Sequence, residues 1–170
     1  MFRFFGKKKE LTLLEAISSM LSSDSLERAA LRCADWRDLI EVAASETPKY
    51  SARQFASKVA GLIGITFQER VEPADLSLLE AGIGIKDLLR MAVIPVTSDA
   101  RVTALVCVDP SRLKNLPSAY VGLPRRLALW SSIQVALEES ERLHRRRTAR
   151  NSSRTVSSLH EAVRSILGML

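Results

Sequence analysis

The alternation of hydrophobic and polar residues predicts helices before the middle of the chain. Between residues 11 and 45, apolar side chains recur every three or four positions, which is typical of amphipathic helices. Asp24 and Glu27 have the spacing of a capping box and mark the start of the longer helix there. Pro48 disfavours helical backbone at the residue before it. We therefore expect residues 11–47 to form a helical hairpin.

A main domain is predicted over residues 51–147. It opens with a helix over residues 51–64, whose apolar residues repeat at i, i+4, i+7 and i+8 and for which Gly64 is a natural end. An extended segment follows at residues 65–67. Two further short helices are expected at residues 73–80 and 86–90.

Strand patterns follow these helices. The apolar runs 92–96 and 102–108 predict a β-hairpin, in which Pro95 indicates an edge strand or a bulge. A third run, over residues 125–131, leads into a helix for which Ser131 and Gln134 supply a capping box. The pattern predicts an α+β fold in which a small, mainly antiparallel sheet of three to four strands packs with helices.

The C-terminal region is predicted to contain a linker and an amphipathic helix. Residues 148–157 are polar, and a third capping box, at Ser158, begins a helix over residues 158–170. An apolar stripe along that helix needs a covering surface, which could be the N-terminal hairpin, a second copy, another protein or a membrane. Its members are Leu159, Val163, Ile166, Leu167 and Leu170.

Composition and charge indicate a globular protein and disfavour a nucleic-acid-binding domain. The 170 residues are 46% hydrophobic and 26% charged, values typical of globular proteins. The net charge of +6 comes from the two ends, because residues 10–141 hold 14 Lys and Arg against 18 Asp and Glu. Six arginines lie between Arg142 and Arg154. Nucleic-acid-binding domains usually carry their basic surface on the folded body, so this distribution disfavours them.

The sequence predicts a cytoplasmic protein, with peripheral attachment at the inner membrane as an alternative. No run of about 18 apolar residues is present, and Met1–Glu10 lacks the apolar core of a signal peptide. Cys33 and Cys107 lack metal-ligand spacing and are expected to be buried small side chains. Residues 1–10 combine three Phe with four cations, a composition suited to weak membrane contact or to packing on a neighbour.

No catalytic or metal-binding motif is apparent. His144 and His160 lack the spacing of a paired metal site, and the chain contains no nucleophile-elbow motif. Glu138, Glu139 and Glu141 lack an apolar setting that would raise a carboxyl pKa for acid–base catalysis. We therefore expect a non-enzyme without a metal or cofactor.

Three short motifs carry a family resemblance. A helix ends in Leu62-Ile-Gly-Ile-Thr-Phe67, a strand carries Ala92-Val-Ile-Pro-Val96, and a second strand ends in Asp109-Pro110. In this order and spacing, residues from about 51 to 140 resemble the N-terminal domain of type II secretion and type IV pilus assembly ATPases. Thr66 stands where that family has a proline, and the chain contains no P-loop.

The resemblance implies a non-catalytic regulatory or adaptor module. Such modules dock on an inner-membrane platform protein, occur joined to glycosyltransferases that make exopolysaccharide, or, in one branch, bind cyclic di-GMP. That branch uses helical motifs beginning Arg-Leu-Gly, and none precedes Ser51. Residues with charge suited to a nucleotide phosphate are Arg53, Lys58, Arg145, Arg146, Arg147 and Arg150.

Three functions therefore remain open from the sequence. The first is an adaptor that binds a protein partner or a second copy through the stripe at residues 158–170. The second is a nucleic-acid binder that uses residues 142–154, against which the acidic body and the lack of nearby aromatic residues both argue. The third is a membrane-surface protein that uses Phe2, Phe4 and Phe5.

Overall fold

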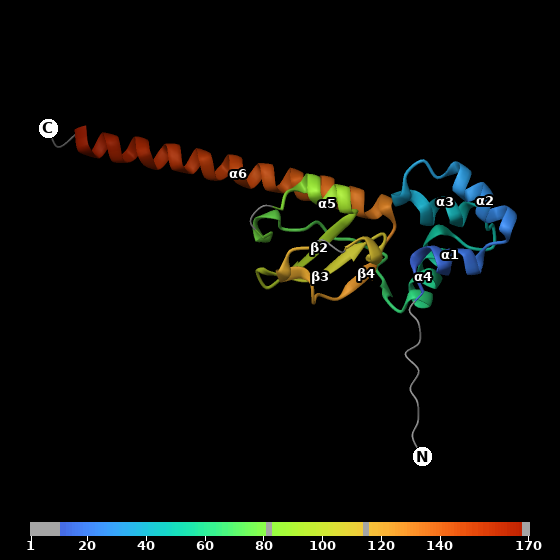
Figure 1. The fold of residues 1–170 in the computed structure, drawn as a ribbon. Coiled ribbons are helices and arrows are strands. Elements are labelled where there is room, and N and C mark those ends of the chain that lie inside the picture. The colour runs from blue at the N-terminus through green and yellow to red at the C-terminus, as the bar shows by residue number, and fades with distance from the viewer. Residues whose placement is uncertain (1–10, 81–82, 114–115, 168–170) are drawn as a thin grey trace, which may run out of the picture.

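A computed structural model describes residues 11–80, 83–113 and 116–167, with side chains described up to Ser152. The predicted α+β class is confirmed: a four-stranded sheet has helix α6 (Trp130–Leu167) along one side and a group of helices at one end (Figure 1). The predicted basic and aromatic tail, residues 1–10, lies outside the described residues.

The N-terminal segment contains three α-helices rather than the predicted two-helix hairpin. They are α1 (Leu13–Met20), α2 (Ser23–Arg32) and α3 (Leu39–Ser45), with a 3-10 turn at Trp36–Asp38. Helix α2 is capped by Ser22, whose hydroxyl accepts from the Ser25 N–H, and not by Asp24. The expected single helix to Ser45 is interrupted because the Asp35 carboxylate accepts from the Arg37 N–H and starts a new turn.

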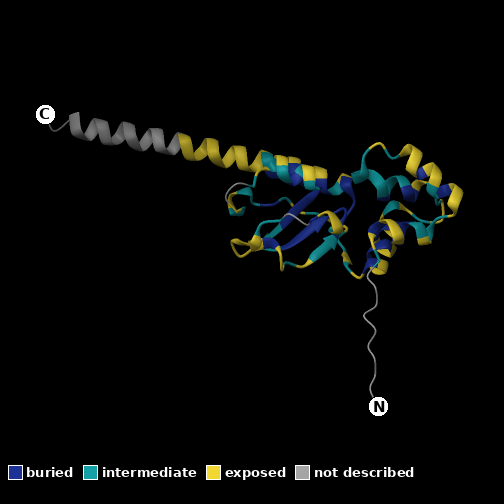
Figure 2. Ribbon diagram, in the orientation of Figure 1, coloured by how far each residue is buried: buried dark blue, intermediate teal, exposed yellow. Residues whose placement is uncertain are grey.

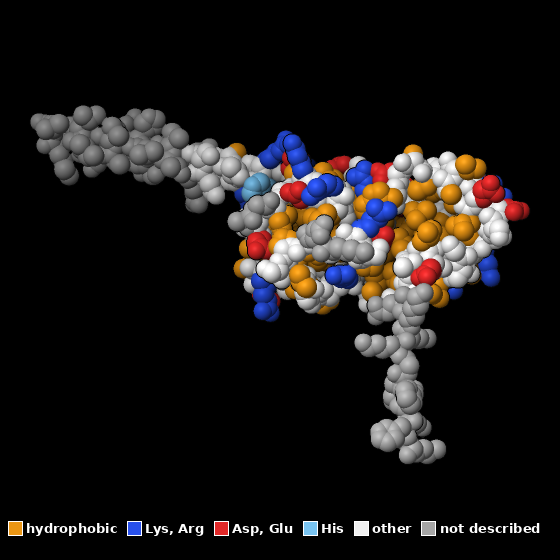
Figure 3. Space-filling model, viewed as in Figure 1, with side chains coloured by type: hydrophobic (Ala, Val, Ile, Leu, Met, Phe, Trp, Pro, Cys, Tyr) orange, Lys and Arg blue, Asp and Glu red, His pale blue; other side chains and the backbone are white. Residues whose placement is uncertain are grey.

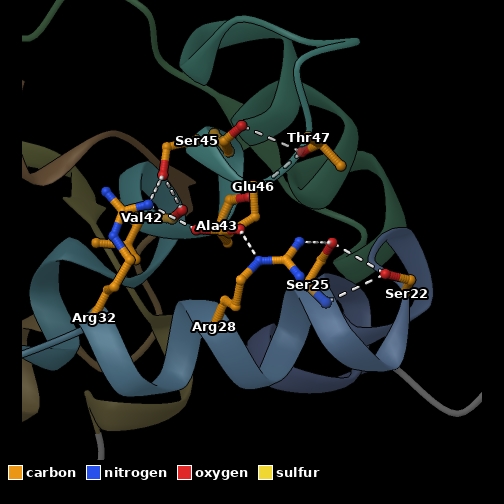
Figure 4. A network of polar contacts seen from close by, with 10 residues as sticks. Ser22, Ser25, Arg28, Arg32, Val42, Ala43, Ser45, Glu46 and Thr47 are labelled. Carbon is orange, nitrogen blue, oxygen red and sulfur yellow. Dashed lines mark hydrogen bonds and ion pairs between the residues drawn. The ribbon is translucent and has the colours of Figure 1, made fainter.

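A buried carboxylate joins α2 to the end of α3. Glu46 accepts from Arg28 and from Arg32, each at 2.7 Å, and its side chain is 8% exposed (Figure 4). Hydrogen bonds from these two arginines hold the pKa of Glu46 below its ordinary value. The two charges that α2 presents on successive turns therefore fix α3 in place.

The helix predicted at residues 51–64 is confirmed as α4 (Ala52–Ile63). Ser51 and Gln54 form its capping box, and Gly64 ends it with φ +77°, a left-handed conformation that glycine adopts without strain. Strand β1 (Thr66–Phe67) follows, and α5 (Ile85–Met91) matches the third predicted helix. The helix predicted over residues 73–80 is only a 3-10 turn at Leu76–Leu78.

The predicted hairpin is confirmed as β2 (Val93–Ser98) and β3 (Arg101–Cys107). Its turn residues Asp99 and Ala100 both have positive φ, as a two-residue hairpin turn with the twist of the strands requires. Strand β2 is at the edge of the sheet, and the register shifts after Val96, so Pro95 sits on the edge strand next to a bulge as expected.

The sheet is mixed, and the expected antiparallel pairing is present in the β2–β3 hairpin. The strand order is β1-β4-β3-β2, and β4 (Arg125–Leu127) pairs in parallel with both β3 and β1. Residues 108–124 form a long connection, which carries the chain back along β3 before β4 begins. Such a crossover produces parallel pairing, whereas the alternation of side chains along each strand is the same in both pairings.

One buried cluster joins the N-terminal helices, the sheet and α6 (Figure 2). Phe55 of α4 is fully buried, as are Ile17 of α1 and Ile40 of α3. From the other side, Leu127 of β4 and Leu137 of α6 complete the cluster. The segments predicted as residues 11–47 and 51–147 therefore share one core.

The predicted linker at residues 148–157 and the helix start at Ser158 are also wrong. Helix α6 is continuous from Trp130 to Leu167, a stretch without proline or glycine. Two hydroxyls of the polar segment bond within the helix: Thr148 donates to the His144 carbonyl at 3.1 Å and Ser152 to the Thr148 carbonyl at 3.0 Å. Polar residues spaced along a helix do not by themselves break it.

Candidate functional site

Helix α6 begins in the core and continues beyond the rest of the folded protein, which we call the body (Figure 1). Its first part packs on the sheet through Ile133, Ala136 and Leu137, all buried. Ser140, 1% exposed, accepts a hydrogen bond from the Ala74 N–H at 2.8 Å and donates to the Ala136 carbonyl at 2.6 Å. Because a buried amide needs a partner, Ser140 fixes the 73–75 segment to the helix.

The N-terminus of α6 is capped by another helix. The Glu41 carboxylate of α3 accepts from the Ser131 N–H at 3.0 Å and from the Ser131 hydroxyl at 2.9 Å. The predicted capping box of Ser131 and Gln134 is therefore wrong: a negative charge that is distant in sequence occupies the positive end of the helix dipole. The second Glu41 oxygen is buried and has no hydrogen-bond partner among the described residues.

Arg37 adds a second link from the N-terminal helices, to α5 and to the start of α6. Its guanidinium lies 4.7 Å from the centre of the Trp130 ring and donates to the Leu89 carbonyl at 3.3 Å. The Asp35 carboxylate accepts from it as well, which keeps the pKa of Asp35 below its usual value. Stacking and ion pairing together orient the start of α6.

The last ion pair between α6 and the body is that of Arg147 with Asp75, within the described side chains. Hydrogen bonds from Ser77 and then from Arg147 lower the pKa of Asp75. Asp75, Arg147, His144 and Thr97 contribute to the lining of a hollow of about 230 Å³ beside the helix. We name residues 148–167, which follow this ion pair, the arm. Its 20 helical residues span about 30 Å.

The arm extends past the body in Figure 1, and its described residues, from Thr148 to Ser152, are all exposed. Near its root, Arg142 pairs with Glu139 and Arg145 with Glu141, each at 2.6 Å. Arg146 and Arg150 make no ion pair with a described residue. The predicted arginine run is therefore a helical surface of which only part is neutralised.

The predicted nucleotide-binding cations do not form one site. Arg53 of α4 pairs with Glu69 at 2.7 Å beside a hollow of about 680 Å³, whose other lining residues include Arg70 and Ser131. Lys58 lies 5.2 Å from the Tyr50 ring and lines a separate hollow of about 560 Å³. The remaining candidates, Arg145, Arg146, Arg147 and Arg150, are on α6.

The surface of the body has mixed charge. On the face shown in Figure 3, Lys and Arg side chains alternate with Asp and Glu, and hydrophobic side chains gather over the N-terminal helices and their junction with the sheet. Most arginines of the body have a carboxylate partner, as with Arg53 and Arg28. The described residues form no broad basic surface on this face (Figure 3).

The nucleophiles and metal-ligating residues give no catalytic arrangement in the described part of the chain. Burial raises the pKa of the Cys107 thiol to about 12, and burial together with Asp38 and Asp35 raises that of Cys33. Thiols with raised pKa values are poor nucleophiles at neutral pH. Among the described residues, no three His, Cys, Asp or Glu side chains are grouped to hold a metal ion.

The predicted partner-binding stripe lies on the arm. Leu159, Val163, Ile166 and Leu167 belong to the continuous helix, and their side chains, like the whole of Leu170, lie outside the part that is described. The sequence interpretation missed Glu41, Ser140 and the Asp75–Arg147 pair. The one signal available was that Ser140 continues the apolar stripe of Ile133, Ala136 and Leu137 at helical spacing.

Comparison with known proteins gives no family model and no curated protein that matches this chain. The three motifs of the predicted resemblance lie at the junction of α4 with β1, on edge strand β2, and directly after β3. None of the described helices is long and apolar enough to cross a membrane.

Proposed function

We propose that this protein is a non-catalytic adaptor whose arm is the element that binds another protein. The observation that carries the proposal is the division of α6: residues 130–140 are fixed into the core, whereas the described residues beyond Arg147 contact solvent. Isolated helices are marginally stable in water, and helices usually depend on the packing of an apolar face. A helix that continues far beyond its own core therefore presents a surface for a partner.

The charge of the arm supports a protein-binding role over a nucleic-acid-binding one. Three of its neighbouring arginines, Arg142, Arg145 and Arg147, are already paired with carboxylates of the body or of α6. The chain has no aromatic residue after Trp130 on which a base could stack. The body that carries the arm is acidic overall, which disfavours contact with phosphate backbones.

Cross-linking in cells that express the protein tests the proposal. We expect a cross-linked species with the full chain and its loss when the chain ends at Ser152. A matched control exchanges Arg53, which is on α4 and not on the arm, for glutamine, and this variant is expected to keep the species. Retention of the same species by the shortened chain would show that another surface binds the partner.

Cyclic di-GMP binding stays a prediction of the family resemblance and is separate from the arm. Its candidate residues Arg53 and Lys58 line different hollows. A calorimetric titration of the purified chain with cyclic di-GMP tests it, with a Kd of about 1 μM or tighter, about −8 kcal/mol, as the positive result. Loss of that heat in the Arg53→Gln variant would assign the site to the larger hollow.

A further inference from the structure

The arm carries the spacing of a coiled-coil seam. Five apolar residues are separated by three, four, three and four positions, which places them at alternating a and d positions of a heptad: Val156, Leu159, Val163, Ile166 and Leu170. The backbone is helical without a break up to Leu167, as such a seam requires. Beyond Ser152 the heptad positions follow from the sequence spacing along this helix.

The same heptad positions, followed back towards the body, lie on the free side of α6. Ile133, Ala136, Leu137 and Ser140, which pack on the body, occupy the b, c and f positions. The a and d positions are exposed in every case from Val135 onward: Val135, Glu138, Arg142, Arg145, Ala149 and Ser152. A second helix can therefore approach along this seam without displacing α6 from the sheet.

The charge pattern indicates what kind of helix fits. From Arg147 onward, all five charged side chains occupy b or f positions, on the outside of a two-helix assembly: Arg147, Arg150, Arg154, Glu161 and Arg164. The flanking e and g positions from 148 to 167 hold no Asp, Glu, Lys or Arg. Charges at e and g normally select a different partner or repel an identical one. Because the arm has no such charges, its e and g positions do not oppose pairing with a second, identical arm.

We infer that the arm pairs with the arm of a second copy of this chain in a two-stranded coiled coil. Val156 and Val163 at a positions, with Leu159 at d, are the combination that favours two strands, whereas Ile166 at d and Leu170 at a do not add to that preference. Arg142 and Arg145 at the root of the seam are polar and are paired with Glu139 and Glu141, so the apolar contact is confined to the end of the arm. The inference rests on the proposed function and names the second copy as the partner.

Sedimentation equilibrium of the purified full chain tests it. We expect twice the mass of the chain, with dissociation on dilution because the seam is short. The double variant Leu159→Glu/Ile166→Glu places like charges in the seam and is expected to sediment as a monomer. The matched control Ser157→Glu/Ser165→Glu adds the same charge at b and c positions and is expected to remain a dimer.

Cross-linking through single cysteines gives an independent readout. In a Cys33→Ser background, in which Cys107 stays buried, Val163→Cys is expected to form a disulfide between two chains under mild oxidation. Glu161→Cys, at an outer f position, is not expected to do so. Circular dichroism of each variant checks that the body is folded, since the core residues all precede Glu138.

The outcomes separate this inference from the proposed function. A wild-type chain that sediments as a monomer at all concentrations overturns the coiled coil, whatever else the arm binds. If the cellular cross-link still depends on the arm, the adaptor function stands with a different partner. Equal cross-linking at residues 161 and 163 likewise overturns the heptad register.

Discussion

Both halves of α6 are helical, but different interactions support them. Between Trp130 and Ser140, one side of the helix is buried against the sheet, and tertiary contacts from Glu41 and Ala74 satisfy its polar groups. From Thr148 to Ser152, every described side chain is exposed, and the hydroxyls bond to the helix itself. The first half is a structural element, and the second is a surface that the fold supplies for a partner.

Substitutions in the packed half of α6 are expected to lower the free energy of unfolding much more than substitutions beyond it. Leu137→Ala removes a fully buried side chain and is expected to lower the free energy of unfolding by about 2–5 kcal/mol. Leu143→Ala, about two turns further and 38% exposed, is the matched control and is expected to cost well below half of that. Chemical denaturation of both variants measures the difference, and equal losses would contradict the assigned end of the core.

Ser140→Ala is expected to have the next largest effect. It leaves the buried Ala74 N–H without its acceptor, which costs about 1–3 kcal/mol. Ser152→Ala, whose hydroxyl bonds within the exposed part of the helix, is the control and is expected to be nearly neutral. A neutral Ser140→Ala would mean that Ala74 finds another partner.

The hydrogen bonds that Asp75 accepts from Ser77 and then from Arg147 predict a pH dependence at the boundary of the two halves. Because the pKa of Asp75 is lowered in the folded state from 3.8, its contribution is present above pH 3.8 and is lost as the pH falls through the folded value. Asp75→Asn is therefore expected to reduce stability at neutral pH by up to about 1 kcal/mol. The difference in stability between the variant and wild type should vanish at acidic pH, as measured by denaturation at a series of pH values. A difference that stays constant with pH would exclude ionisation of Asp75 as its cause.

Removal of the arm is expected to have the smallest effect on the body. A chain that ends at Ser152 should unfold within about 0.5 kcal/mol of the full chain, compared below the concentration at which the full chain self-associates. The same truncation should abolish dimer formation in sedimentation. A loss of several kcal/mol would show instead that the arm packs on its own body, which is one of the surfaces considered for the stripe.

The sequence predicted the parts of the fold that depend on neighbours along the chain. Gly64 ended α4 where the pattern indicated, and the alternating runs gave the β2–β3 hairpin with Pro95 on an edge strand. The polar run at residues 148–157 was misinterpreted as a linker, because polarity shows that a segment is not buried but not that it is unfolded. The cations predicted to bind a nucleotide are exposed, but their positions in the sequence gave no information on whether they lie together in the fold.

The pairing of the sheet and the position of α6 depended on contacts between distant residues. The side-chain period is the same for parallel and antiparallel strands, so only the path of residues 108–124 made β4 parallel to β3. Glu41 and Ser131 are 90 residues apart, and their contact arises only when α3 and α6 meet in the shared core. By itself, the sequence determined the local helices, the hairpin and the heptad spacing of the arm. The tertiary structure decided which side of α6 is buried, and therefore that the seam faces outward, because burial depends on the whole fold.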